Sequence, residues 1–265
     1  MEKQIASMRK LPHLLLTPIL LLSIAFSALA QNSAPPRQQQ AEAEKAFKRG
    51  NALMEKRKPE EALVHYQKAL AILPNEPTIL FNGGMAAFAG KDYILAADLW
   101  NRLKTLDPLD WHTRTKLVQV YQAMDKLADR DKERGELFEM WKAGKPAELR
   151  EQFEYCRDQF EVKGQKVMVF EHFELKGPRA LRYVFSVLNK NEDGEEFRIS
   201  LGSYDVTNSV WRVTKNPPPK ADERLFHLDR YTQNSHATLG MYFPEPSYDE
   251  VRAIVIQALQ NKPAP

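Results

Sequence analysis

An internal repeat of 34 residues is the feature that most constrains the fold of this chain. Two stretches carry small, aromatic and proline residues at the same offsets. They are Gly50, Ala62, Tyr66 and Pro74 in the first stretch, and Gly84, Ala96, Trp100 and Pro108 in the second, each 34 residues after its counterpart. A period of this length with this pattern is typical of helical hairpins that stack on one another. The N-terminal half is therefore expected to be an all-α repeat array.

Each copy of the repeat reads as two helices. Apolar residues at helical spacing predict helices over 41–56, 60–73, 78–89 and 92–106. Pro59 suits the first turn of a helix, where its missing N–H costs no hydrogen bond. The Asp92 side chain is expected to cap the last of these helices. The Gly and Ala positions would let the two helices of a hairpin cross closely.

A third hairpin follows, but it departs from the pattern. Asp110 is a suitable cap, and helices are expected over 111–124 and 129–142. Arg130 and Arg134 stand where Ala and an aromatic residue would fall. Terminal repeats are often atypical because one of their faces has no neighbouring repeat. We expect this hairpin to cap the stack or to dock the domain that follows.

With these residues at this spacing, 41–143 resembles the tetratricopeptide repeat family, strongly in two units and weakly in the third. The resemblance implies a right-handed superhelix whose inner groove is lined by the first helix of each hairpin. Such a groove binds a peptide or a partner helix. By this resemblance the partner-binding residues are Phe47, Asn51, Met54, Phe81, Asn82, Met85, Phe88, Thr115, Lys116 and Gln119.

Two other interpretations of the groove residues stay open. Some members of the family grip a C-terminal carboxylate, and Asn51, Asn82 and Lys116 match three positions of that arrangement. Phe47 and His112 stand where two further cations would be needed, which leaves little charge-assisted bonding. The alternative is that Phe47, Met85 and Phe88 only complete the packing of the hairpins, as apolar residues at helical spacing often do.

The C-terminal half changes from a hydrophobic period of 3.6 to one of 2 at about residue 153. A hairpin turn is expected at Lys163-Gly164. Ser247 and Glu250 form a capping box that opens a final helix with an apolar stripe. Strands are expected over 159–162, 167–175, 180–189, 196–203, 224–231 and 236–243, with 204–214 ambiguous and a Pro-rich loop at 216–220.

The fold class is therefore α+β multidomain. A solenoid of two clear tetratricopeptide repeats and one degenerate repeat is expected over 41–145. An antiparallel β-rich domain of about six strands, covered by a C-terminal helix, is expected over 146–265. We recognise no family in this second domain.

The sequence offers no convincing catalytic residue. Cys156, His172 and His236 are the only conceivable nucleophile and base, and no motif surrounds them. A zinc site would need His172, His227 and His236 with Glu171 or Glu174, whose spacing matches no ligand motif. We therefore expect neither a metal nor a cofactor. Aromatic residues are numerous enough to line a ligand cavity or to form a sheet core: Tyr183, Phe185, Trp211, Phe226 and Tyr242.

Residues 1–30 have the three parts of a secretory signal peptide. Lys3, Arg9 and Lys10 form a basic start, an apolar run follows, and Ala28-Leu29-Ala30 suits cleavage. An uncleaved anchor is the alternative. Residues 31–40 are polar and rich in Pro and Gln, which predicts a disordered linker. We expect an exported protein, most simply periplasmic, with secretion or a signal anchor as alternatives and no membrane contact after cleavage.

Net charge excludes one class of partner. The formal charge is +3, and the first 30 residues supply +2 of it, so the mature chain carries about +1. Nucleic-acid binding would need a clustered basic face, which this balance does not provide. The expected function is a non-catalytic interaction with a protein or peptide through the groove. The alternatives are a β domain that is a hydrolase-like enzyme or small-ligand receptor recruited by the repeats, and repeats that mediate homo-oligomerisation.

Overall fold

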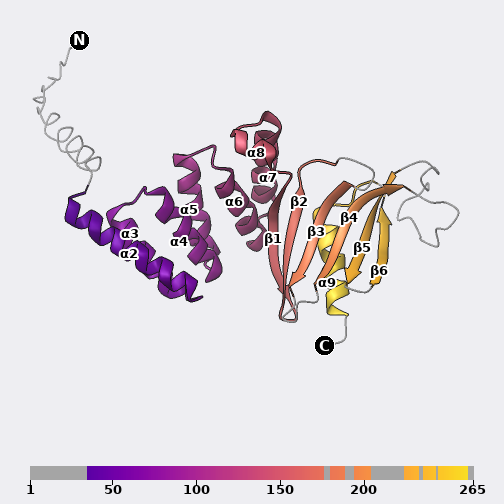
Figure 1. Ribbon diagram of the computed structural model, residues 1–265, viewed down its shortest axis with the longest axis horizontal. Coiled ribbons are helices and arrows are strands. Elements are labelled where there is room, and N and C mark those ends of the chain that lie inside the picture. Colours follow the sequence, from indigo (N-terminus) through magenta and orange to yellow (C-terminus); the bar gives the residue numbers. More distant parts are fainter. Residues whose placement is uncertain are drawn as a thin grey trace, which may run out of the picture.

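A computed structural model describes residues 35–175, 180–188, 194–203, 224–232, 235–242 and 244–261. Stacked helical hairpins form the N-terminal part, and a six-stranded sheet with one helix on it forms the C-terminal part (Figure 1). The expected signal peptide lies outside the described residues. No helix in the described ranges is long and apolar enough to cross a membrane.

Six helices form three consecutive hairpins, as the repeat predicts. They are α2 (Arg37–Glu55), α3 (Pro59–Ile72), α4 (Pro77–Ala89), α5 (Tyr93–Leu106), α6 (Trp111–Ala123) and α7 (Leu127–Ala143). Asp92 and Asp110 cap α5 and α6 by accepting backbone N–H groups. One boundary differs, because α2 begins at Arg37 directly after Pro36. Residues 37–40 of the expected linker are therefore helical.

The repeated small residues allow the close approach that the pattern predicts. A Cβ added at Gly50 would lie 2.7 Å from the Tyr66 ring, and one at Gly84 would lie 2.3 Å from the Trp100 indole. Ala62 and its counterpart Ala96 are fully buried. In each of the two regular units, the large aromatic residue of the second helix therefore fills the space that the glycine of the first helix leaves.

The C-terminal part is an antiparallel meander in which each strand pairs with the next. Its strands are β1 (Glu154–Val162), β2 (Gln165–His172), β3 (Ala180–Leu188), β4 (Glu195–Ser203), β5 (Arg224–Thr232) and β6 (Ser235–Tyr242). Lys163 and Gly164, both at positive φ, make the predicted turn. The first strand is longer than predicted and begins at Glu154. The expected Pro-rich loop and the ambiguous segment 204–214 lie outside the described residues.

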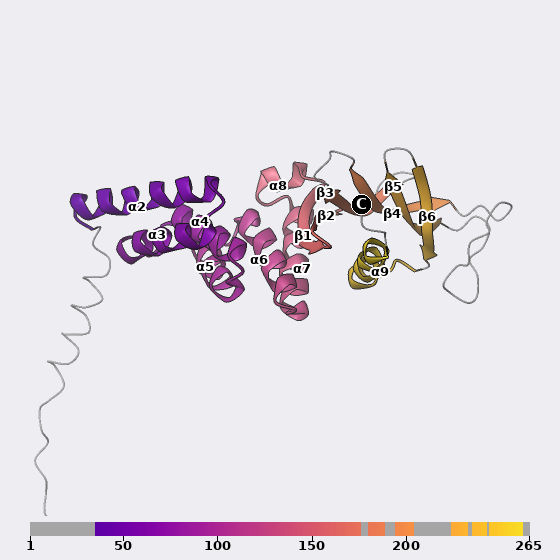
Figure 2. The same ribbon diagram turned by 90° about the horizontal axis from the view of Figure 1, so that it is seen from below.

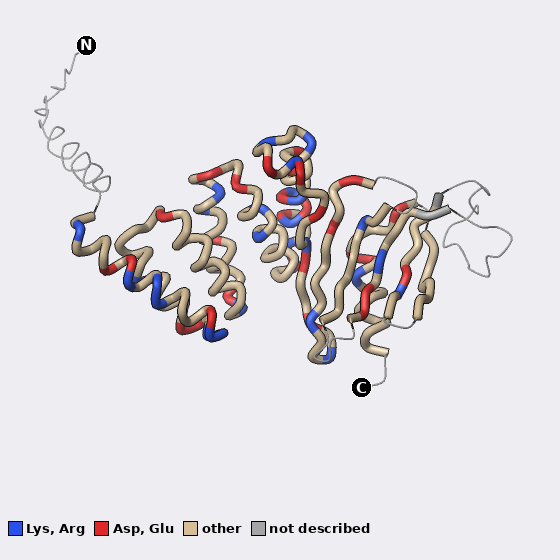
Figure 3. Tube along the Cα trace, viewed as in Figure 1, with Lys and Arg blue, Asp and Glu red and all other residues tan. Residues whose placement is uncertain are grey.

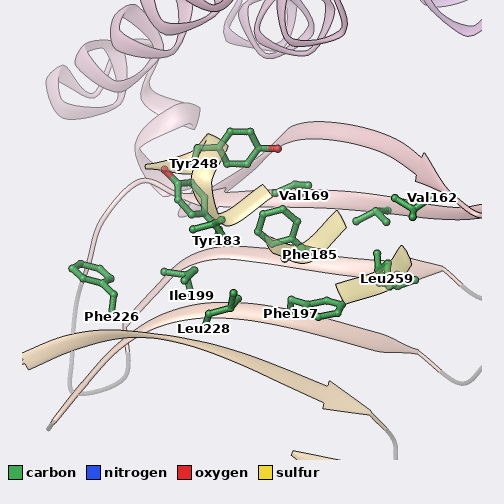
Figure 4. Close-up of a cluster of buried hydrophobic side chains, with 14 residues drawn as sticks. Val162, Val169, Tyr183, Phe185, Phe197, Ile199, Phe226, Leu228, Tyr248 and Leu259 are labelled. Atoms are coloured by element: carbon green, nitrogen blue, oxygen red, sulfur yellow. The ribbon is translucent and has the colours of Figure 1, made fainter. Parts of the chain in front are cut away.

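One face of the sheet is covered by α9 (Tyr248–Gln260), which starts with the predicted capping box. Strand residues such as Phe185 and Ile199 point toward this helix, whose Tyr248 and Leu259 complete the core (Figure 4). Tyr183, Phe185 and Phe226 belong to this core, and Tyr242 packs against it. These aromatic residues therefore form a sheet core rather than the lining of a cavity, and Trp211 lies outside the described ranges.

The third hairpin docks on the sheet through both aromatic and charged residues. Phe138 stacks on Trp141, Trp141 on Phe173, and Phe173 on Tyr155, with ring centroids 5.2–5.7 Å apart. This column connects α7 with β1 and the end of β2. A short helix, α8 (Ala147–Glu151), contributes Leu149 to the same buried cluster.

Charged residues gather where α7 meets the sheet (Figure 3). Arg134 of α7 donates to the buried carboxylate of Glu171 on β2, which also accepts from Arg157 and from the Tyr155 hydroxyl. Arg130 holds Asp249 at the start of α9 through two hydrogen bonds of 2.8 and 3.1 Å. The two arginines that break the repeat pattern thus bind the β domain, which confirms the docking interpretation.

Candidate binding groove

The first helices of the hairpins supply the expected groove residues. On α2, Phe47, Asn51 and Met54 recur at spacings of four and three, which places them on one face. On α4, Phe81, Met85 and Phe88 do the same, with Asn82 beside them. All seven side chains are half-buried, so each contributes both to packing and to the surface.

A bridge of two amides connects the first two units of the groove. The Tyr66 hydroxyl donates to Asn51 Oδ1 at 2.7 Å, and Asn82 Nδ2 donates to the same oxygen at 3.2 Å. Tyr66 comes from α3, so the second helix of the hairpin fixes the orientation of the groove amide. The Asn51 NH₂ group and the Asn82 carbonyl are not used by this bridge. They can serve as donor and acceptor for a peptide backbone.

The aromatic residues of the groove have packing roles as well. The Phe47 ring is tilted against Tyr66 with centroids 5.9 Å apart, and Phe88 lies 5.4 Å from Tyr93 and 5.9 Å from Trp100. Both rings therefore take part in the packing of their hairpins. They nevertheless remain half-buried, which leaves part of each ring at the surface. Rigid, partly exposed rings of this kind provide apolar contact area at little conformational cost.

The third unit differs, because two of its three groove positions are buried. Gln119 is 3% exposed, and its Nε2 donates to the Cys156 carbonyl of β1 at 2.6 Å. Thr115 is also buried and donates to the His112 carbonyl. The expectation that these two residues face a partner is therefore corrected. Gln119 belongs to the contact between α6 and β1, which the spacing of the repeat does not encode, whereas Thr115 is bonded within α6.

Lys116 is the one charged residue among the ten predicted groove positions, and it is half-buried. Burial lowers its pKa, and the nearby thiol of Cys156 opposes that change. Its Nζ lies 3.5 Å from Gln119 Oε1. The alternative in which the groove binds a C-terminal carboxylate would need two further cations. Phe47 is apolar, and the His112 side chain is paired with Asp110, whose Oδ1 lies 3.5 Å from His112 Nδ1.

The suspected nucleophile and base do not come together. Cys156 and His172 lie on one face of neighbouring strands, where Cys156 pairs with Phe170 and His172 with Glu154. The thiol contacts the Asp158 carbonyl at 3.6 Å rather than a histidine, and burial raises its pKa, which disfavours the nucleophilic thiolate. His236 lies on β6 beside Asp229, at the far edge of the sheet.

The suspected zinc ligands are also separated. His172 lies on β2, His227 on β5 and His236 on β6, while Glu171 is held in the contact with α7. Across the described residues, no three His, Cys, Asp or Glu side chains are grouped to hold a metal ion. Burial lowers the pKa of both His172 and His227.

Sequence reasoning missed the buried charged cluster at Glu171. Arg157 is 2% exposed and lies with its guanidinium 4.1 Å from the centre of the Tyr248 ring. Burial, reinforced by the Glu171 charge, raises the pKa of Tyr183 to about 12. The signal for this cluster was Arg134, a charged residue at a repeat position that should be aromatic. Its partner on β2 cannot be identified without the register of the sheet.

Comparison with known protein families gives a match to the first repeat of this chain. The sequence model of the tetratricopeptide repeat matches residues 41–76. None of the curated proteins compared with this chain matches it.

The chain is also similar to several solved structures. The tetratricopeptide domain of Sgt2 from Aspergillus fumigatus is 24% identical, with a TM-score of 0.36 over 40% of this chain and 71% of that one. The first such domain of Spaghetti (RPAP3), solved with an HSP90 peptide, is 22% identical, with a TM-score of 0.36 over 42% and 90%. MamA is 22% identical, with a TM-score of 0.35 over 47% and 67%. Residues 41–76, which the tetratricopeptide repeat model matches, form the first of three consecutive helical hairpins within the described residues.

Proposed function

We propose that this chain is a non-catalytic interaction protein whose groove over α2 and α4 binds a peptide segment of a partner protein. The amide bridge of Asn51 and Asn82 carries this proposal. It fixes two side-chain amides in adjacent units, each with a polar atom left for a peptide backbone. Half-buried Met54, Phe81 and Met85 flank the pair and suit a hydrophobic anchor of the peptide.

The proposal also includes export to the periplasm. The basic start, apolar run and small-residue cleavage site of residues 1–30 support it. Fractionation of cells that express the full chain tests this part. A mature N-terminus at Gln31 in the extracytoplasmic fraction is the expected result, and a protein retained in the cytoplasm would contradict it.

Peptide binding is tested by selecting short random peptides from a display library on residues 31–265. Dissociation constants are then measured for synthetic copies of the selected peptides. Met85→Ser removes an apolar groove contact, and Asn82→Ala removes one amide of the bridge without touching the Tyr66 hydrogen bond. Each change should weaken binding about tenfold, which corresponds to about 1.4 kcal/mol.

Val64→Thr is the matched control, because Val64 lies on α3 with 63% of its surface exposed. It should leave the dissociation constants unchanged. The function is refuted if the library yields no binder above a surface without protein. It is also refuted if the two groove variants bind the selected peptides as tightly as the Val64 variant does.

A further inference from the structure

The first half of β6 forms an exposed edge of the sheet. In the described ranges the strand order ends at β6, which pairs with β5. Both Figure 1 and Figure 2 show β6 as the outermost strand, at the end of the molecule opposite α2. Ser235, His236, Ala237 and Leu239 are exposed. The stretch 235–239 therefore has no strand beyond it among the described residues, and such an edge is a template for another strand.

The side chains of β6 lack the features that keep most sheet edges apart. Charged residues, lysine above all, and proline on an edge strand oppose pairing with a second strand. The sequence of β6 contains no Asp, Glu, Lys, Arg or Pro, and the His236 imidazole lies 3.4 Å from Asp229 of the same sheet. The Tyr242 side chain lies back over Gly240, where an added Cβ would be 2.8 Å from the Tyr242 hydroxyl oxygen. Two copies of this strand therefore bring no acidic or strongly basic side chains against each other.

The opposite edge of the sheet decides which partner fits. At β1 that edge is covered by α6, whose Gln119 Nε2 donates to the Cys156 carbonyl at 2.6 Å. The described sheet thus offers one open edge, so that self-pairing through it closes a dimer and does not continue into a filament. A two-fold axis normal to the sheet makes the two β6 strands antiparallel and keeps the α9 helices of both copies on one side. The core beneath α9 then continues from one copy to the other.

We propose that β6 pairs with β6 of a second copy of this chain and joins the two six-stranded sheets into one. Because the two-fold axis passes through the middle of the paired stretch, 235–239 places Ala237 opposite the partner's Ala237. Ser235 then lies opposite the partner's Leu239. The small Ala237 side chains allow the two strands to approach closely at the axis. The α2 helices, and the two proposed peptide grooves with them, lie at the far ends of this dimer.

Sedimentation velocity of residues 31–265 over a range of concentrations tests the dimer, whose mass should be twice that of one chain. Ala237→Glu brings two carboxylates together at the axis and should weaken the dimer about tenfold or more. In its own chain the new carboxylate stands opposite Arg230 of β5, so the monomer should stay folded. Leu188→Glu is the matched control, since Leu188 is 50% exposed on the inner strand β3 and stands opposite Lys166. It should leave the dimer unchanged.

A disulfide gives a second measurement, which does not depend on destabilising the dimer. In a chain that carries Cys156→Ser, Ala237→Cys should form a covalent dimer on oxidation. The reason is that residues opposite each other in an antiparallel pair lie within reach of a disulfide. Leu188→Cys in the same background should stay unlinked at the same concentration.

The outcomes separate this inference from the proposed peptide binding, on which the dimer does not depend. A chain that remains a monomer up to about 0.1 mM overturns the dimer. A dimer that Ala237→Glu leaves intact, or that Ala237→Cys fails to link, overturns it too, because the contact then lies elsewhere, as on the repeats. Each of these results leaves the groove function standing. Loss of peptide binding with an intact dimer counts against the function alone.

Discussion

At the scale of single residues, the glycines of the first two hairpins show how the absence of a Cβ atom allows the two helices of a hairpin to pack closely. Gly50 and Gly84 lie at equivalent positions, and each is in contact with the large aromatic residue of its own unit. Any larger side chain would push that ring out of the stack. The glycines therefore act through close packing, although glycine disfavours a helix by roughly 1 kcal/mol relative to alanine.

Gly84→Ala should lower the free energy of unfolding by about 1–3 kcal/mol, because the new Cβ would overlap the Trp100 indole. Gly135→Ala is the control, since Gly135 lies inside α7 and an added Cβ there meets nothing within 4 Å. That change should raise the stability by about 0.5–1 kcal/mol through helix propensity alone. Urea unfolding of both variants measures the difference. Equal effects of one sign would contradict the packing explanation.

At the scale of elements, α9 is specified by local chemistry. The Ser247 backbone N–H donates to Glu250 at 2.7 Å, and the Glu250 N–H donates to the Ser247 hydroxyl at 3.3 Å. These bonds satisfy two groups at the start of the helix that have no partner within it. Hydrogen bonds from Ser247 also lower the pKa of Glu250.

Ser247→Ala should destabilise the protein by about 1 kcal/mol, because the helix that covers the sheet then loses its cap. Glu250→Ala removes the carboxylate that accepts from the Ser247 backbone N–H and is the second variant of the experiment. Thermal unfolding of both single variants and the double variant provides the readout. The double variant should lose less than the two single losses combined, since either change disrupts the reciprocal pair. Strictly additive losses would show that the two bonds act independently.

The element that departs from its pattern is α7. Its sequence favours a helix, but Arg130 and Arg134 replace the residues that would contact a fourth repeat. The structure explains the replacement, since the β domain occupies the place of that repeat and presents Asp249 and Glu171 to the two arginines. The stack of hairpins is thus completed by a domain of another class.

At the scale of the whole molecule, Glu171 connects the two parts. Burial by itself raises the pKa of this carboxyl, but Arg157 and Arg134 outweigh burial and hold it below its ordinary value. The unfolded chain therefore binds the proton more readily than the folded chain. The stabilising contribution is complete above the unfolded pKa and is lost as the pH falls through the folded pKa.

Glu171→Gln should reduce stability at neutral pH by about 3–5 kcal/mol, because the buried Arg157 and the half-buried Arg134 lose their carboxylate. The remaining stability should then fall less steeply on acidification below about pH 4.5, since the titrating group is gone. Glu139→Gln is the control, as Glu139 pairs with Lys142 on the exposed side of α7 and should contribute at most about 1 kcal/mol. Urea midpoints measured from neutral to acid pH distinguish the two. Identical acid slopes for wild type and Glu171→Gln would contradict this assignment.

The sequence by itself determined several features that depend on neighbours in the chain. The register of Gly50 and Gly84, the Asp92 cap, the Lys163-Gly164 turn and the Ser247 box all act over a few residues or one repeat. Their positions can therefore be predicted from spacing and propensity. The first part of β1, residues 154–158, was not predicted as a strand. Its residues contact α6 and β2 and do not follow a simple alternation of apolar and polar residues.

Only the tertiary structure decided which groove residues remain available and what binds the arginines of α7. Asn51 and Asn82 meet across two hairpins, and Gln119 is taken by a strand 37 residues further along the chain. The first contact depends on how the hairpins stack and the second on how the sheet docks, and a local hydrophobic period records neither. The repeat thus sets the spacing of the predicted groove residues, whereas docking of the sheet buries Gln119 of the third hairpin.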